Sequence, residues 1–125
     1  MSMDGRPRLA VGHVSLEVED VTGAYAFFVR HGMRGIFKGE DFGVLELRGG
    51  THLVVRRAEG AIESGRPAPF DLMVDDVEAA RAGYVEQGFA ATGIGRGRIH
   101  DSFVVTGPDG YRISITSSHA GGRPV

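Results

Sequence analysis

Hydrophobic and polar residues alternate along this chain in a pattern that predicts short strands and two helices. Residues 13–18 switch strictly between polar and apolar side chains, which predicts a strand at about 9–18 with one buried face. Apolar residues then recur at helical spacing, with Asp20 placed as the N-cap and Gly32 as the residue just beyond the helix end. Short runs between glycine-containing turns predict three further strands, at about 34–38, 42–47 and 51–57.

The second half of the chain repeats the plan of the first. Asp76 and Gly88 bound a second helical stretch that aligns with the first without a gap. The pairs that match between the helices include Ala24 with Ala80, Phe28 with Tyr84 and Val29 with Val85. A duplicated unit predicts two similar half-sheets that face one another, with a site where they meet. The second-half elements are predicted as strands at about 70–74, 89–93, 99–106 and 111–116 and a helix at about 77–87.

We therefore predict a single domain over residues 1–125 that contains two modules. The first module is placed at 9–57 and the second at 70–117. Residues 58–69 hold two prolines and two glycines without periodicity, which is typical of a linker. Residues 118–125 are predicted to be a frayed tail.

Composition narrows the class of protein. With 42% hydrophobic and 24% charged residues, the chain is expected to fold rather than stay disordered. A net charge of −2 argues against nucleic acid as a partner. Because no apolar run approaches the length of a membrane span and the N-terminus is polar, we expect neither membrane insertion nor a signal peptide. The absence of cysteine excludes disulfides and thiolate chemistry and fits a cytoplasmic protein.

Three segments together resemble the vicinal-oxygen-chelate superfamily, which includes glyoxalase I, extradiol dioxygenases and bleomycin-resistance proteins. They are residues 12–20, the helix entry at 74–76 and the turn at 108–110. The resemblance implies an α+β fold of two βαβββ modules, whose curled and mostly antiparallel sheets form a shared cleft with the helices outside. It also implies a homodimer. Because the superfamily contains lyases, isomerases, dioxygenases and pure binders, the fold alone does not decide the function.

Metal-dependent members of this superfamily carry ligands at four positions, on the first and last strand of each module. In this chain those positions hold His13, Val54, Pro69 and Ser114. Only His13 is a strong ligand, whereas a catalytic metal site normally needs about three protein ligands. We therefore expect no metal and no other cofactor. A displaced site made of His13, His52 and Asp71 is the alternative that would overturn this expectation.

If the apolar positions of the strands face the helices, the alternate positions face the cleft. These alternate positions give the predicted ligand-binding residues, which are His13, Ser15, His52, Arg56, Asp71, Arg112 and Ser114. Arg112 and Arg56 favour an anionic or oxygen-rich ligand. In the competing interpretation, Arg112 pairs with Asp71 or Glu17 and the site is neutralised internally. The polar face could also simply meet water.

Three functional hypotheses remain open at this point. The leading one is a metal-independent protein that binds a small molecule, to sequester it or to sense it. The second is a lyase, isomerase or dioxygenase that uses His13 as a general base or a displaced metal site. The third is a partner-binding domain with a vestigial cleft. His31 is expected to interact with the C-terminus of the first helix, and Tyr84 is expected to pack between helix and sheet.

Overall fold

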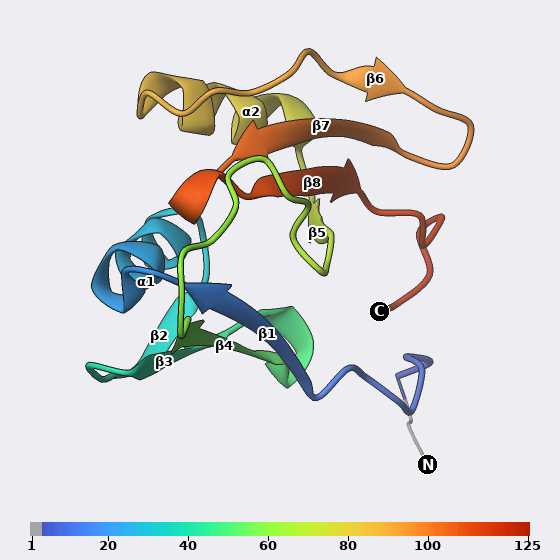
Figure 1. Cartoon of the computed structure of the whole chain (residues 1–125). Helices are drawn as coiled ribbons and strands as arrows, with labels where there is room; N and C mark the ends of the chain where they lie inside the picture. The colour runs from blue at the N-terminus through green and yellow to red at the C-terminus, as the bar shows by residue number, and fades with distance from the viewer. Residues whose placement is uncertain (1–3) are drawn as a thin grey trace.

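The first half of the protein folds into a four-stranded sheet with one helix, as seen in a computed structural model that describes residues 4–125 (Figure 1). Its elements are β1 (His13–Val18), α1 (Val21–Arg30), β2 (Arg34–Lys38), β3 (Phe42–Glu46), a 3₁₀ turn η1 (Arg48–Gly50) and β4 (His52–Arg57). The strand order is β1-β4-β3-β2, in which β1 runs parallel to β4 and the other neighbours are antiparallel. We call this sheet 1.

The second half builds sheet 2 on the same plan. Its elements are β5 (Leu72–Val74), α2 (Val77–Glu86), β6 (Gly95–Arg96), β7 (Asp101–Thr106), a 3₁₀ turn η2 (Pro108–Gly110) and β8 (Arg112–Ser117). The order β5-β8-β7-β6 and the parallel pairing of β5 with β8 repeat the topology of sheet 1. The predicted α+β fold of two βαβββ modules is confirmed.

The two helices begin and end in the same way, which explains why the sequence marked them so clearly. The carboxylate of Asp20 accepts the N–H of Gly23, and that of Asp76 accepts the N–H of Ala79, each at 3.0 Å. At the other end, Met33 donates its N–H to the carbonyl of Phe28, and Phe89 does the same to Tyr84, each at 3.0 Å. Gly32 and Gly88, at φ of 117° and 90°, supply the left-handed residue that this ending requires.

Each sheet has one face buried by a helix and one face turned away from it. In β1, Leu16 and Val18 are buried while His13, Ser15 and Glu17 are exposed. The same alternation separates the buried and less buried residues of β3, β4, β7 and β8. We call the sides that carry His13 and Arg112 the outer faces of sheets 1 and 2.

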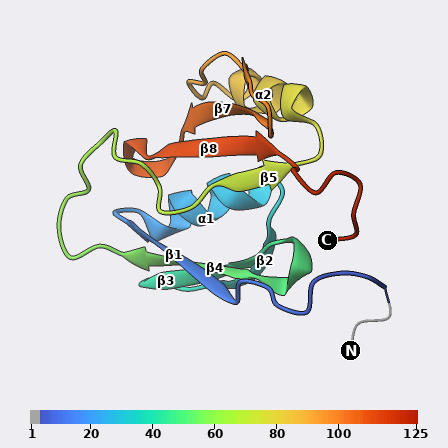
Figure 2. The same ribbon diagram turned by 90° about the vertical axis from the view of Figure 1, so that its right-hand side faces the viewer.

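Side chains of α1 join the two modules into one core. In both views α1 lies between the two sheets, whereas α2 lies next to β7, at the part of sheet 2 that is farther from sheet 1 (Figures 1 and 2). Phe27 packs its ring against Tyr84 and Phe89, with centroids 5.9 and 4.9 Å away. A hydrogen bond of 2.7 Å from the Tyr111 hydroxyl to the carbonyl of Glu17 adds a polar link between the modules.

Several strand limits differ from the sequence prediction, and three of the differences concern the edges of the modules. Strand β1 starts at His13, since residues 4–12 form an arm without regular structure. Strand β5 starts at Leu72 rather than residue 70, because Pro67 and Pro69 lack the N–H needed for a continuous ladder. Strand β6 is Gly95–Arg96, so the predicted strand at 89–93 is wrong; the pairing there is one bridge between Ala91 and Val105.

Candidate functional site

A row of polar side chains crosses the outer face of sheet 1. His13 and His52 are direct neighbours on the parallel strands β1 and β4, and their rings lie edge to face with centroids 6.0 Å apart. On the next strand, Glu46 pairs with His52, and beyond it Arg34 pairs with Glu46. Sheet register therefore places four side chains from four strands in one line. We call these four residues the polar row.

Direct contacts hold the polar row together. Arg34 donates from its guanidinium to Oε1 of Glu46 at 2.8 Å, and Oε2 of Glu46 lies 3.1 Å from Nε2 of His52. When His52 is neutral, this contact makes Nε2 the protonated nitrogen and leaves Nδ1 as a hydrogen-bond acceptor. Glu46 thereby orients an imidazole that can accept a hydrogen bond from a bound molecule.

Apolar side chains border the polar row on the same face. Val54 of β4 and Val44 of β3 are opposite each other and half-buried. Phe37 is opposite Val44 and remains 48% exposed; it contacts Phe42, which is 43% exposed, at a centroid distance of 5.2 Å. A flat organic group could therefore lie on apolar side chains while its polar atoms reach His13 or His52.

The other two predicted residues of sheet 1 lie farther along their strands than the polar row, Ser15 two residues beyond His13 and Arg56 four residues beyond His52. Ser15 pairs with Val54, and Arg56 is flanked by Glu17 on one side and Phe42 on the other. Arg56 and Glu17 also line a small cavity of about 320 Å³ where β4 leads into the linker. The four predicted residues of the first module thus share one face.

The three predicted residues of the second module lie along sheet 2. Arg112 pairs with Thr106, and Ser114 pairs with Val104. Asp71 precedes β5, which runs beside β8. Within residues 4–125, Arg112 forms no ion pair with Asp71 or Glu17, so the predicted internal neutralisation is not made.

The alternative metal site is not formed in the described part of the chain. There, no group of three or more His, Asp or Glu side chains could hold a metal ion. The side chain of His52 contacts Glu46 and not Asp71. A cavity of about 1180 Å³ lies between the two modules, and of the seven predicted ligand residues only Asp71 lines it. The structure therefore groups the predicted residues within each sheet and does not bring the two groups together.

The environment of His31 differs from the sequence expectation. Its ring stacks on Tyr84, with centroids 4.1 Å apart, and also contacts Phe27 and Phe89. Its Nε2 is buried without a hydrogen-bond partner among the described residues. Burial, and then the charge of Arg30, lower the pKa of His31, whereas a favourable interaction with the helix C-terminus would raise it.

Burial also raises the pKa values of two tyrosines, Tyr84 and Tyr111. It raises the pKa of Tyr84 from its ordinary value of 10.0 to about 12, which makes the phenol harder to deprotonate. Burial is the main cause that raises the pKa of Tyr111 as well. Neither phenol is thereby prepared to act as a base, which fits a packing role for Tyr84.

Sequence reasoning missed Glu46 and Arg34. Both residues belong to strands that were predicted. The place of Glu46 beside His52 depends on the register of β3 and β4, and the place of Arg34 beside Glu46 depends on the register of β2 and β3. That register shifts at an irregularity between Gly35 and Phe37, which the sequence does not reveal.

This arrangement of paired βαβββ modules matches several solved structures. Lactoylglutathione lyase from Agrobacterium tumefaciens superimposes with a TM-score of 0.73 at 18% identity, over 94% of this chain and 99% of that one. The chain has the vicinal-oxygen-chelate fold. A bleomycin-binding protein from Streptomyces verticillus shares this fold with a TM-score of 0.70 at 22% identity, over 90% and 99% of the two chains. The antibiotic-binding protein TnmS3 from a Streptomyces species has a TM-score of 0.74 at 23% identity, over 90% and 98%.

Comparisons by sequence add nothing more specific. No protein-family model matches the chain, and no curated protein matches it. At these identities the vicinal-oxygen-chelate fold is shared without showing a common activity. Separately, neither helix in residues 4–125 is long and apolar enough to cross a membrane.

Proposed function

We propose that this protein binds a small organic molecule on the outer face of sheet 1 without a metal ion. The observation that carries the proposal is the polar row beside exposed aromatic and half-buried aliphatic side chains. A solvated sheet face does not need an imidazole oriented by a carboxylate, and that carboxylate in turn held by Arg34. Binding sites do combine apolar surface with a few oriented polar groups.

Metal independence is supported by the donor set. Val54 and Pro69 offer no side-chain ligand, and Ser114 offers only a neutral hydroxyl. His13 alone cannot hold a divalent ion against water. The carboxylate nearest to it in the polar row, Glu46, is already shared between His52 and Arg34.

The proposed ligand carries an anionic or oxygen-rich group. Arg56 and Arg112 make no hydrogen bond or ion pair with a side chain in residues 4–125, so both guanidinium groups remain available. Ser15 and Ser114 add neutral hydroxyl donors on the two outer faces. The bleomycin-binding and antibiotic-binding proteins with this fold support ligand binding as the activity of this chain.

We further propose that the cleft is completed in a homodimer. Within one chain the two outer faces carry separate halves of the predicted site, so a second copy would supply sheet 2 to face sheet 1. Edge strands β1 and β5 are available for such an arrangement, and exposed Ile36 and Phe37 would gain cover from it. The proposed location is the cytoplasm.

The test is a thermal-shift screen of small organic anions and antibiotics, including metal-free bleomycin, in the presence of EDTA. We expect at least one compound to stabilise the protein. Val54→Asp should abolish that effect, because it places a charge among the apolar side chains that border the polar row. The matched control is Ala82→Asp, on the exposed side of α2. Stabilisation that requires a metal ion, or that survives Val54→Asp, would contradict the proposal.

One observation favours an enzymatic alternative. The contact between Glu46 and His52 is the arrangement that orients a general base, and it singles out His52 rather than His13. If the protein is an enzyme, His52→Gln should remove turnover while it leaves ligand-induced stabilisation within a few degrees of wild type. Turnover that depends on His13 alone would exclude His52 as the base.

A further inference from the structure

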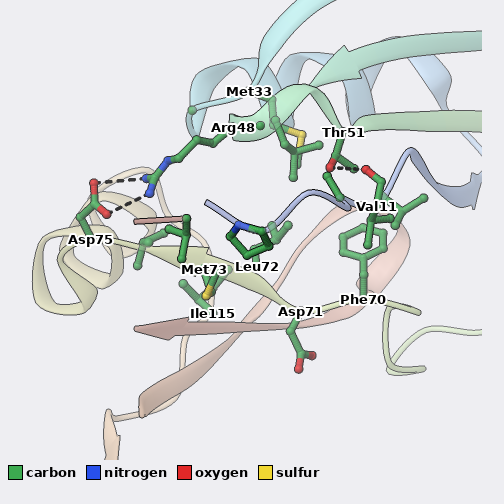
Figure 3. A pocket seen from close by; sticks show the side chains of 18 of the residues that line it. Val11, Met33, Arg48, Thr51, Phe70, Asp71, Leu72, Met73, Asp75 and Ile115 are labelled. Atoms are coloured by element: carbon green, nitrogen blue, oxygen red, sulfur yellow. Dashed lines mark hydrogen bonds and ion pairs between the residues drawn. The ribbon is translucent and has the colours of Figure 1, made fainter. Parts of the chain in front are cut away.

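A second cavity lies on the opposite side of the sheets from the proposed ligand site. It occupies about 1180 Å³ between the modules, next to the end of α1 (Figure 3). Its apolar wall includes Val14 of sheet 1, Met33 after α1, and Leu72, Val74 and Ile115 of sheet 2. These are side chains from the helix-facing sides of both sheets, which normally form a closed core.

Comparison of the two modules shows why this space is open. Leu16 and Val18 in β1 are 2% and 0% exposed. Their counterparts in the repeat, Leu72 and Val74 in β5, are only half-buried. The helix α2 packs on β7 and β8, and core side chains cover Leu72 and Val74 only in part. Sheet 2 therefore presents an apolar strip that its own helix does not bury.

Segments of the same chain close the sides of the cavity. Arg48 of η1 forms a two-pronged ion pair with Asp75 after β5, with both N–O distances at 3.2 Å, and this pair bridges the modules (Figure 3). Residues 6–11 of the N-terminal arm form another wall. The arm is fixed near its end, where the Thr51 hydroxyl donates to the carbonyl of Val11 at 2.5 Å and His52 donates its N–H to Gly12 at 2.9 Å.

We propose that this cavity is a second binding site, which takes a small amphipathic molecule with an apolar body and one anionic head group. The volume is slightly above the range typical of small-molecule sites, so it can hold a molecule of that size. The ion pair and the arm obstruct a folded protein partner but leave room for a small molecule. The side chain of Leu9 in the arm is 91% exposed, so it does not fill the cavity.

The charge of the rim selects the head group. Arg6 and Arg48 are paired with carboxylates of Asp4 and Asp75. Arg8 also lines the cavity and has no ion pair or hydrogen bond within the described residues. The remaining acidic residue of the rim, Asp71, turns its carboxylate away from the cavity (Figure 3). An unpaired guanidinium beside apolar side chains complements a carboxylate or sulfonate attached to a hydrocarbon or aromatic body.

The test uses 8-anilinonaphthalene-1-sulfonate as a fluorescent probe, titrated into the full chain at two protein concentrations with light scattering in parallel. We expect saturable binding, displaced by octanoate several-fold more effectively than by 1-octanol, because Arg8 recognises the charge. Val74→Trp, which fills the cavity, should weaken probe binding about tenfold or more, the equivalent of one or two lost apolar side-chain contacts. Arg8→Gln should remove the advantage of octanoate over 1-octanol.

Val54→Asp on the outer face is the control and should leave probe binding unchanged. If Val54→Asp abolishes probe binding while Val74→Trp does not, the probe sits at the proposed ligand site, and the second site is refuted while that function stands. Loss of probe binding when the chain self-associates would identify a second copy as the occupant and overturn the inference. Leu72→Gln, a milder change at a half-exposed position, keeps the test valid if Val74→Trp fails to fold.

Discussion

The imidazole of His31 stacks on the phenol ring of Tyr84, with centroids 4.1 Å apart and ring planes 24° apart. This contact joins the end of α1 to α2 and so connects the two modules. Burial first, and the nearby charge of Arg30 second, lower the pKa of His31 below its ordinary value of 6.5. The folded state thus favours the neutral ring, while the unfolded chain protonates normally.

The resulting prediction concerns stability in mild acid. As the pH falls below about 6.5, the unfolded state takes up a proton before the folded state does, so the free energy of unfolding should decrease until the pH passes the lower folded pKa. Urea unfolding at several pH values measures this slope. His31→Phe should flatten it in that window, whereas His119→Gln, at an exposed position near the C-terminus, should not. An unchanged slope in His31→Phe would show that His31 is not the source of the pH dependence of stability.

Asp109 is the one residue other than glycine with positive φ among those described, at φ 54°. Its carboxylate accepts the N–H of Glu19 at 2.7 Å and so links η2 to the end of β1. Asp109→Ala should destabilise the fold by about 2–4 kcal/mol, because it loses a charged hydrogen-bond acceptor and places alanine in the left-handed region. Asp109→Gly loses the bond alone and should cost less. Equal losses for the two variants would mean that the backbone conformation contributes nothing.

The repeat provides a matched pair of core substitutions. Leu16→Ala, at a position 2% exposed, should cost about 2–5 kcal/mol. Leu72→Ala, at the equivalent but half-buried position beside the cavity, should cost about 1 kcal/mol. Urea denaturation of both variants measures the difference. If Leu72→Ala proves as costly as Leu16→Ala, β5 is covered in solution, and the inter-module cavity is closed.

The proposed dimer can be tested by building a metal site across it. Val54→Glu, Pro69→His and Ser114→Glu together with native His13 would place a ligand at each of the four positions used by metal-dependent proteins with this fold. If the outer faces meet in a dimer, this triple variant should bind about one zinc ion per chain, because four such ligands suffice for a closed site. Val54→Glu alone should bind zinc weakly. A monomeric triple variant without zinc would reject the proposed pairing of faces.

The sequence predicts the elements of this protein better than the way they pack. The helices were predictable because Asp20 and Asp76 cap them and Gly32 and Gly88 end them, all through local interactions. The short β5 was not, because the effect of Pro69 on an edge strand depends on the neighbouring strand.

The site shows the same division between local and long-range information. Alternation along the strands correctly separated His13 and Ser15 from the buried residues of β1. It could not place Glu46 beside His52, since that contact depends on the register between β3 and β4. The open cavity beside β5 was equally hidden, because it depends on how the two modules pack against each other.

Metal-free recognition is tested most directly by calorimetric titration of the best stabilising compound from the screen into protein dialysed against EDTA. We predict unchanged affinity after chelation, and a loss of affinity of at least about tenfold in Val54→Asp, where the charge would have to be buried against the ligand. Binding that disappears with the metal, or that is equally tight in Val54→Asp, would contradict metal-free recognition on the outer face of sheet 1.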